Sequence, residues 1–478
     1  MKDRTVHPCV IGSELVATSG QLDVLDPATG KVFAHTARGT GEHIDAAVTA
    51  ARAASMQWGR EPVRERSAVL RRIADLLRRD RAELAALESQ DTGKPLTQAR
   101  ADADVAARYF EYYANTLEAF FGHTLPLDND IHAYTRPVPF GVTGHIIPWN
   151  YPLQIGCRTV APAIAAGNCA VVKPAEDAPL TVLRLGRLAL EAGLPPGVLN
   201  VVPGLGAEAG AALAAHAGID HLSFTGSVDV GARVAAAAAA NVIPTALELG
   251  GKSPNVVFGD ADLDRAVPII VRSVIQNAGQ TCSAGSRLLL HESVRDRALD
   301  MIGAALGALS IGSGLSDPDL GPLISAKQLH RVQAMVERAL PDATRHSRTG
   351  VVDVPVDGFY YPPTLLADVD PQSEIAREEV FGPVVAATTF ADTDEAIALA
   401  NGTDYGLIAA VWTRDLDTAH IAAEQIRAGQ VYLNTYGAGG GVEFAFGGFK
   451  KSGYGREKGF EALAAFCQTK TVVLRVGR

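Results

Sequence analysis

Residues 169–202 read CAVVKPAEDAPLTVLRLGRLALEAGLPPGVLNVV, and this stretch decides the fold class. The short apolar runs 169–173 and 198–202 have the length and composition of buried strands, and the helical pattern 179–192 lies between them. The same alternation continues on both sides of the stretch, with strands at 141–150, 221–224 and 245–249 and helices before and between them. Alternating strands and helices predict a parallel, doubly wound sheet with both faces covered. Such a sheet binds ligands beyond the carboxyl ends of its strands.

A second alternating run follows and predicts another α/β unit. Its strand candidates are 256–258, 287–291, 384–390, 407–413 and 430–434. Residues 1–40 suggest short strands and turns, and helical patterns cover 46–58, 63–87 and 102–113. An extended segment near 120–136 predicts a hairpin arm, and the tail 469–476 predicts one more strand.

Composition excludes several classes of protein. The chain has 478 residues, 47% of them hydrophobic and 20% charged, as in soluble globular proteins. The formal charge of −10 argues against a nucleic-acid surface. We expect no membrane span and no secretory signal, because no segment approaches about 18 uninterrupted apolar residues. The five cysteines and twelve histidines lack metal-ligand spacing, so we expect no metal, and unpaired cysteines favour a reducing cytoplasm.

Three polar residues in unusual settings suggest nucleophilic chemistry. Cys282 lies in the small, polar, glycine-containing segment 277–283. Glu248 stands between two leucines at a strand end, where burial of an acid raises its pKa and suits it to act as a general base. Asn150 follows Trp149 at another strand end and could donate to an oxyanion. Each has a structural alternative: a buried cysteine, a strand-end acid that reaches water, and a turn residue.

Other strand ends predict a phosphate- and ribose-binding surface. Lys173 and Glu176 follow one strand, and that carboxylate could accept hydrogen bonds from ribose hydroxyls. Gly204-Leu205-Gly206 with a late third glycine is a weak dinucleotide fingerprint. Gly226 and Ser227 form an anion site at a helix N-terminus. A tight turn, an exposed charge pair and an unoccupied helix end remain open as alternatives.

Together these segments resemble the NAD(P)-dependent aldehyde dehydrogenase superfamily, from Asp26-Pro27-Ala28-Thr29-Gly30 to the motif around Gly453. The resemblance implies Cys282 as nucleophile, Glu248 as general base and Asn150 as oxyanion donor. It also implies Glu457 as an acid near the water and proton path. Because the acylating branch generally lacks an acid at position 248, we expect the hydrolytic, non-acylating branch.

The resemblance implies an aldehyde dehydrogenase-like α/β fold of two doubly wound domains and a small β oligomerisation arm. We expect a dinucleotide-binding domain over 1–117 and 140–249, a catalytic domain over 250–447, and an arm over 118–139 and 466–478. Family members usually form homodimers or homotetramers. Glu176 favours NAD, with NADP possible, because a carboxylate repels a 2′-phosphate. The implied cofactor residues are Ile147, Trp149, Lys173, Glu176, Gly206, Gly226, Ser227, Glu379 and Phe381.

Two positions depart from the family pattern. Arg158 stands where relatives often place an aromatic residue in the substrate tunnel, and could grip the distal carboxylate of a semialdehyde. The alternative is a structural arginine paired with a neighbouring acid. Thr159 stands where many relatives carry lysine. The other expected tunnel residues are Tyr151, Thr281, Ser283, Phe444 and Phe446, which suit aromatic or medium aliphatic aldehydes.

Two other functions remain open. The chain could be a dinucleotide-binding protein without turnover, although Cys282, Glu248 and Asn150 together argue against this. It could also be a thiol esterase that needs no cofactor, although Lys173 and Glu176 argue for the cofactor.

Overall fold

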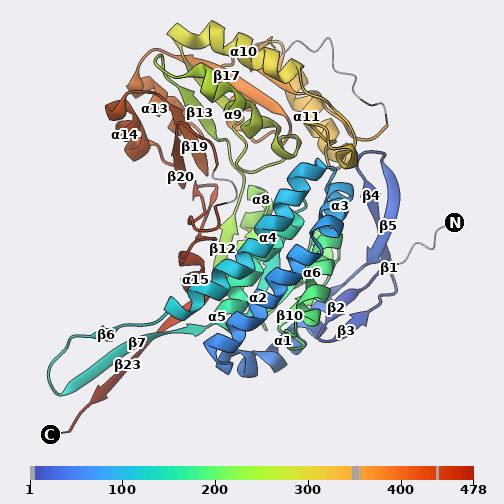
Figure 1. The fold of residues 1–478 in the computed structure, drawn as a ribbon, viewed down its shortest axis with the longest axis vertical. Coiled ribbons are helices and arrows are strands. Elements are labelled where there is room, and N and C mark those ends of the chain that lie inside the picture. The colour runs from blue at the N-terminus through green and yellow to red at the C-terminus, as the bar shows by residue number, and fades with distance from the viewer. Residues whose placement is uncertain (1–5, 347–354, 356, 438–440, 478) are drawn as a thin grey trace.

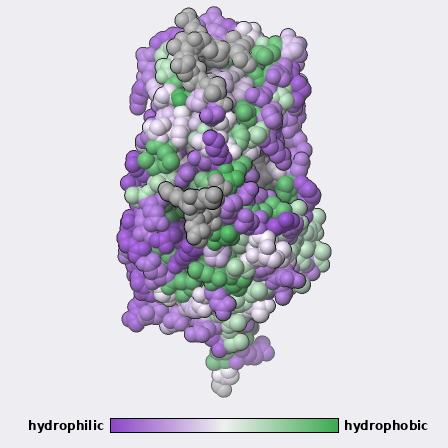
Figure 2. All heavy atoms as spheres, turned by 90° about the vertical axis from the view of Figure 1, so that its right-hand side faces the viewer, coloured by the Kyte–Doolittle hydropathy of each residue, from purple (hydrophilic) through white to green (hydrophobic). Residues whose placement is uncertain are grey.

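The computed structural model describes residues 6–346, 355, 357–437 and 441–477. Two α/β lobes lie one above the other in Figure 1, and a thin β arm projects from the lower lobe. Figure 2 shows a face on which hydrophilic residues predominate, with smaller hydrophobic groups between them. None of the described helices is long and apolar enough to cross a membrane.

The lower lobe contains an eight-stranded sheet in the order β22-β12-β11-β8-β9-β10-β2-β3. Its five central strands are parallel, which confirms the predicted doubly wound sheet. The strand order turns at β8, which pairs with both β9 and β11, and ligands bind beyond the strand ends at such a point. The strands are β2 (Cys9–Ile11), β3 (Glu14–Val16), β8 (Val142–Ile146), β9 (Cys169–Lys173), β10 (Leu199–Val201), β11 (His221–Thr225), β12 (Thr245–Glu248) and β22 (Gly453–Tyr454).

Helices cover this sheet, and the structure corrects two sequence expectations about them. The apolar pattern over 63–87 predicted one helix, but the structure has two helices, α2 and α3, that meet at Asp80. Asp80 accepts hydrogen bonds from Arg79 and Arg184, which hold the break in place. The helix expected between the strands at 198–202 and 221–224 is a π-helical turn over Gly206–Gly210 and a short α7. The helices of the lobe are α1 (Gly41–Arg60), α2 (Val63–Arg79), α3 (Arg81–Thr92), α4 (Leu96–Thr116), α5 (Pro152–Ala166), α6 (Leu180–Glu191), α7 (Ala211–Ala214), α8 (Val228–Ala239) and α15 (Glu461–Ala465).

The upper lobe is built on a seven-stranded sheet in the order β15-β16-β17-β14-β13-β19-β20, parallel except at β15. All five strands predicted for this run are present, whereas β16 was not foreseen. The strands are β13 (Pro254–Val257), β14 (Arg287–His291), β15 (Thr344–Arg345), β16 (Thr364–Ala367), β17 (Val384–Phe390), β19 (Ile408–Trp412) and β20 (Gln430–Leu433). The helices are α9 (Leu263–Ile275), α10 (Arg295–Gly307), α11 (Ala326–Ala339), α12 (Glu374–Arg377), α13 (Thr393–Asn401) and α14 (Leu416–Gln425).

The arm is a three-stranded antiparallel sheet that joins distant parts of the chain (Figure 1). Strand β23 (Cys467–Arg475) pairs along its whole length with β7 (Ile131–Pro139), and β6 (Thr124–Leu125) pairs with β7. The predicted hairpin and C-terminal strand are therefore confirmed. The domain boundaries, including the division at 249, stay a prediction. Smaller pairings join β1 (Val6–His7), β4 (Gln21–Asp26) and β5 (Lys31–Ala37), and β18 (Tyr405–Gly406) with β21 (Phe449–Lys450).

Candidate active site

The segment before Cys282 has an uncommon backbone. Asn277, Ala278 and Gly279 have φ angles of 49°, 53° and 73°, so three consecutive residues lie in the left-handed region. A Cβ on Gly279 would lie 2.1 Å from the Gly382 carbonyl oxygen, so only glycine fits there. Cys282 follows this turn and is partly exposed as a residue.

The two segments that carry Cys282 and Asn150 are joined by hydrogen bonds. The Asn150 side chain, 4% exposed, donates from Nδ2 to the Gln280 carbonyl oxygen at 3.0 Å. The Asn277 side chain donates in the opposite direction, to the Asn150 carbonyl oxygen at 2.8 Å. The Gln280 side chain accepts from the Ile324 N–H at 2.9 Å, which ties the same segment to the upper lobe. Asn277 and Gln280 were not singled out as locking residues, because sequence gives no sign of contacts across 130 positions.

Cys282 lies in a largely apolar setting beside a few charges. It packs against Leu407, Ile408 and Phe446. Burial raises the pKa of the Cys282 thiol to about 12, and Arg158 opposes that rise. The thiol is therefore protonated at neutral pH in the resting protein and needs a base for activation.

Glu248, at the end of β12, is 3% exposed. Neither of its carboxylate oxygens has a hydrogen-bond partner among the described residues. Burial raises the pKa of Glu248 well above its ordinary value, and Glu457 adds to the rise while Arg158 opposes it. A buried carboxyl group with a raised pKa is a stronger base than an exposed one, which suits it to act as a general base.

Arg158 and Glu457 form a buried ion pair. The distance from Arg158 Nε to Glu457 Oε2 is 2.5 Å, and the two side chains are 7% and 3% exposed. Ser223 Oγ donates to Glu457 Oε1 at 3.0 Å. Glu457 is therefore the neighbouring acid that the alternative of a structural Arg158 requires. Binding of a substrate carboxylate by Arg158 stays an untested prediction.

The remaining expected tunnel residues lie around this centre. Tyr151 Oη and Thr281 Oγ1 are 2.8 Å apart, immediately before the nucleophile. The Ser283 carbonyl oxygen accepts from Tyr436 Oη at 2.6 Å, so this residue faces the upper lobe through its backbone. Phe446 is 6% exposed and packs on Cys282, whereas Phe444 is 50% exposed.

The first group of expected cofactor residues surrounds the strand ends of the lower lobe. Lys173 Nζ donates to Glu176 at 2.6 Å, and the Gly206 N–H donates to the same carboxylate at 3.1 Å. Although burial opposes ionisation, Lys173 and the Gly206 N–H lower the pKa of Glu176. Ser227 precedes α8 without capping it through its side chain, so first-turn N–H groups are available to an anion. These features fit an adenosine ribose at Glu176 and a pyrophosphate at Gly226 and Ser227.

The second group includes residues of both lobes. Glu379 accepts from the Gly251 N–H at 3.0 Å, and burial raises the pKa of Glu379 to about 7. Phe381 has a φ of 59°, and its ring meets Trp149 edge to face with the centroids 5.3 Å apart. Gln328 donates to the Phe381 carbonyl oxygen at 2.7 Å, and Arg331 donates to the Glu379 carbonyl oxygen at 2.8 Å. Neither Gln328 nor Arg331 stands in a local pattern that would have predicted this contact. Ile147, which is buried just after β8, donates from its backbone N–H to the Lys173 carbonyl oxygen at 2.9 Å.

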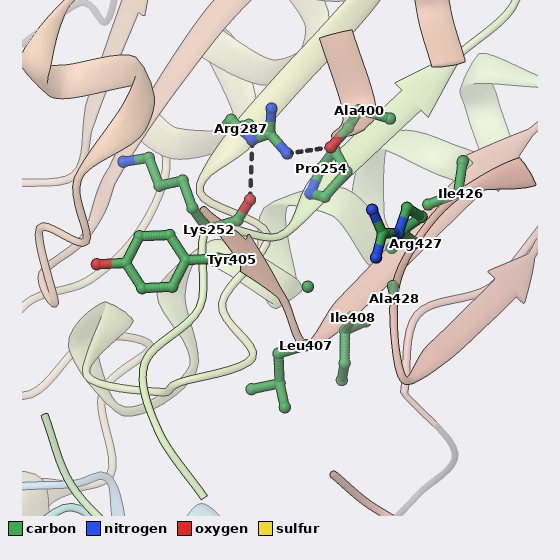
Figure 3. Close-up of a pocket in the computed structure, with 12 residues that line it drawn as sticks. Lys252, Pro254, Arg287, Ala400, Tyr405, Leu407, Ile408, Ile426, Arg427 and Ala428 are labelled. Atoms are coloured by element: carbon green, nitrogen blue, oxygen red, sulfur yellow. Dashed lines mark hydrogen bonds between the residues drawn. The ribbon is translucent and has the colours of Figure 1, made fainter. Parts of the chain in front are cut away.

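A small cavity in the upper lobe is lined in part by Leu407 and Ile408, which belong to the apolar cluster beside Cys282 (Figure 3). The buried Arg287 guanidinium beside it donates to the carbonyl oxygens of Lys252, Leu399 and Ala400. All of these donors are used within the protein, so Arg287 has a structural role there. None of the expected site residues lines this cavity.

Comparisons with known proteins agree with this fold. The model of the aldehyde dehydrogenase family matches residues 15–472. The Arabidopsis thaliana protein named aldehyde dehydrogenase family 2 member B4, mitochondrial, is 42% identical over 98% of this chain and 88% of its own length. A solved structure from Burkholderia cenocepacia has 51% identity and a TM-score of 0.96, covering 98% of this chain and 100% of that one. The NAD⁺ complex of an aldehyde dehydrogenase from Bacillus cereus has 37% identity and a TM-score of 0.96, covering 99% of this chain and 97% of that one. The chain belongs to the aldehyde dehydrogenase family.

Proposed function

We propose that this protein oxidises an aldehyde to a carboxylic acid with NAD, through covalent chemistry on Cys282. The observation that carries the proposal is the pair of hydrogen bonds between the Cys282 segment and Asn150, together with the buried carboxyl group of Glu248. A nucleophile, an oxyanion donor and a base are the groups that acyl chemistry on a thiol requires.

In the proposed reaction, the Cys282 thiol gives its proton to solvent water and the sulfur attacks the aldehyde carbon, so that a C–S bond forms while the carbonyl double bond becomes a single bond to the oxyanion. Asn150 has two N–H donors on its side-chain nitrogen, and the Gln280 oxygen uses one of them. The second is therefore available to the oxyanion, together with the Cys282 backbone N–H. A bound nicotinamide cofactor supplies a hydride acceptor, which leaves an acyl group on the Cys282 sulfur. Glu248 then takes a proton from water, and the resulting hydroxide releases the carboxylic acid.

Several observations support NAD as the cofactor. The carboxylate of Glu176 is placed by Lys173 and the Gly206 N–H, so it can accept from two ribose hydroxyls. A 2′-phosphate there would face the same negative charge, which disfavours NADP. The related enzyme from Bacillus cereus has been solved as an NAD⁺ complex.

The surroundings of the nucleophile support an uncharged substrate. Phe446 lies against Cys282, and the Arg158 guanidinium is engaged with Glu457. We therefore propose aromatic or medium aliphatic aldehydes ahead of semialdehydes with a distal carboxylate.

The five unpaired cysteines support a reducing compartment, which we propose to be the cytoplasm.

The arm supports a homodimer or homotetramer. It projects from the lower lobe and carries exposed apolar side chains, among them Phe121, Leu127 and Val473. Light scattering after gel filtration tests this assembly, and a monomeric mass would contradict it.

The test of the function follows NADH absorbance with a panel of aldehydes. We expect turnover in the wild type and none in Cys282→Ala, whereas Cys467→Ala, a matched change at another partly exposed cysteine, should retain it. In Glu248→Gln, we expect one equivalent of NADH per site in the first turnover and steady turnover reduced by about 10²–10⁴-fold. NAD binding without NADH formation for any aldehyde would favour the non-catalytic alternative. Ester cleavage without NADH formation would favour the thiol esterase.

A further inference from the structure

The residues that follow β5 lie against the loop that leads into the expected cofactor site. The Gly39 N–H donates to the Pro203 carbonyl oxygen at 2.8 Å. A Cβ on Gly39 would lie 2.6 Å from that same oxygen, and a Cβ on Gly204 would lie 2.5 Å from the Gly39 carbonyl oxygen. The two backbones are therefore in direct contact, and only glycine permits so close an approach on either side.

Arg38 extends this contact with its side chain. Its guanidinium binds both oxygens of the Glu208 carboxylate: Nε donates to Oε2 at 3.0 Å, and Nη2 donates to Oε1. The Arg38 backbone N–H donates to Thr18 Oγ1 and to the Gly20 carbonyl oxygen, both at 3.0 Å, which fixes the start of the side chain. An arginine that binds a carboxylate through two parallel hydrogen bonds also fixes the orientation of that carboxylate.

Glu208 lies within the π-helical turn Gly206–Gly210, which contacts two of the expected cofactor residues. The Gly206 N–H donates to Glu176 Oε1 at 3.1 Å, and Lys173 Nζ donates to Oε2 of the same carboxylate at 2.6 Å. At the other end of the turn, a Cβ on Gly210 would lie 3.8 Å from Lys173 Cδ. The position of this turn therefore sets a hydrogen bond that orients the Glu176 carboxylate.

We propose that Arg38 is a positioning residue for the cofactor, which holds the turn through Glu208 and so keeps the Gly206 N–H on the Glu176 carboxylate. This inference rests on the proposed function, in which Glu176 binds the adenosine ribose of NAD. Arg38 then affects the affinity for NAD without touching it. Because the side chains of the ion pair are 43% and 37% exposed, water screens their attraction and the expected effect is modest.

The experiment measures the dissociation constant of NAD by isothermal titration calorimetry, and its KM together with kcat from NADH formation. Arg38→Met and Glu208→Gln should each weaken NAD binding about three- to fivefold, and the change should appear in KM and not in kcat. The double variant should bind NAD as well as either single variant, because the two residues act as one pair. Arg38→Lys keeps the charge without the paired hydrogen bonds and should lie between the wild type and Arg38→Met.

The matched control is Arg81→Met. Arg81 on α3 binds both carboxylate oxygens of Asp104 on α4, at 2.6 and 2.7 Å, and these side chains are 43% and 50% exposed. The control therefore breaks a surface pair of the same kind, and NAD binding should stay at the wild-type value.

A cofactor analogue shows whether the effect of Arg38 passes through Glu176. The analogue is NAD without the 2′-hydroxyl of the adenosine ribose, which removes a hydrogen bond that the Glu176 carboxylate would accept. The wild type should bind NAD more tightly than the analogue. In Arg38→Met that ratio should fall about threefold, because the carboxylate is no longer held for the hydroxyl. In Arg81→Met the ratio should stay unchanged.

Three results would overturn the inference. One is unchanged NAD affinity in both Arg38→Met and Glu208→Gln, and another is additive losses in the double variant. The third is an equal loss of affinity for NAD and for the analogue, since Arg38 would then act without Glu176. If Arg38→Met does not fold, Arg38→Lys and Glu208→Gln test the same pair. Wild-type protein that forms no NADH from any aldehyde would contradict the proposed function, whereas normal NADH formation with unchanged NAD binding in the variants would contradict this inference alone.

Discussion

Replacement of Lys94 by methionine tests whether a buried charge cluster stabilises the lower lobe. Lys94 Nζ lies 2.6 Å from Asp102 and 3.2 Å from Glu88, and the lysine side chain is fully buried. It also lies 4.1 Å from the centroid of the Tyr151 ring, whose hydroxyl contacts Thr281. Methionine keeps the approximate volume and removes the charge, so both carboxylates would be buried without their cation. Breaking a buried ion pair in this way costs about 3–5 kcal/mol.

The assay is guanidinium unfolding followed by tryptophan fluorescence and circular dichroism. Lys31→Met, at an exposed position, is the matched control and should change the free energy of unfolding by less than about 0.5 kcal/mol. Adding Glu88→Gln and Asp102→Asn to Lys94→Met should recover a large part of the loss, because no unpaired charge then remains. A loss below about 1 kcal/mol in Lys94→Met, or no recovery in the triple variant, would refute the reasoning.

Three further outcomes follow from the structure. Burial lowers the pKa of His145 to about 3 and of His221 to about 4, so the unfolded chain binds more protons below about pH 6.5, and Tm should fall as pH drops from 7 to 5. His145→Gln should flatten that fall and the exposed His123→Gln should not; an equal slope in both would contradict it. Glu176→Gln removes the charge that faces a 2′-phosphate and should raise kcat/KM with NADP relative to NAD by about tenfold; an unchanged ratio would contradict the role of that charge. Gly279→Ala places a Cβ 2.1 Å from a carbonyl oxygen and should abolish NADH formation; retained turnover would show that the left-handed turn tolerates a side chain.

The fold could be predicted largely from local patterns. Strand and helix periods are properties of short segments, so both parallel sheets and the separate strands of the arm were within reach of sequence reasoning. The break at Asp80 was not, because the apolar pattern of α2 continues into α3 without a turn signal. Strand β16, which pairs with β15 and β17, was also missed.

The candidate site shows the same division between local and long-range information. Cys282 and Glu248 could be proposed because their own neighbours in the sequence are unusual for those residue types. The pairing of Arg158 with Glu457 could not be chosen over substrate binding, because its two members lie about 300 positions apart. Likewise, the hold of Gln328 on the Phe381 backbone depends on packing between elements that no local pattern links.

The left-handed turn before Cys282 is stabilised by side chains that take no part in the proposed reaction. A left-handed conformation costs roughly 1–2 kcal/mol for a residue with a Cβ, and both Asn277 and Ala278 adopt it. Hydrogen bonds offset this cost: Gln98 accepts from the Asn277 N–H at 2.9 Å, and the Gln280 side chain donates to the Asn277 carbonyl oxygen at 3.1 Å. Because Asn277 also holds the Asn150 carbonyl oxygen, the turn that presents the thiol and the segment that carries the oxyanion donor form one unit. A change in either segment therefore displaces both reacting groups, so the precision of the proposed site depends on residues that do not touch the substrate.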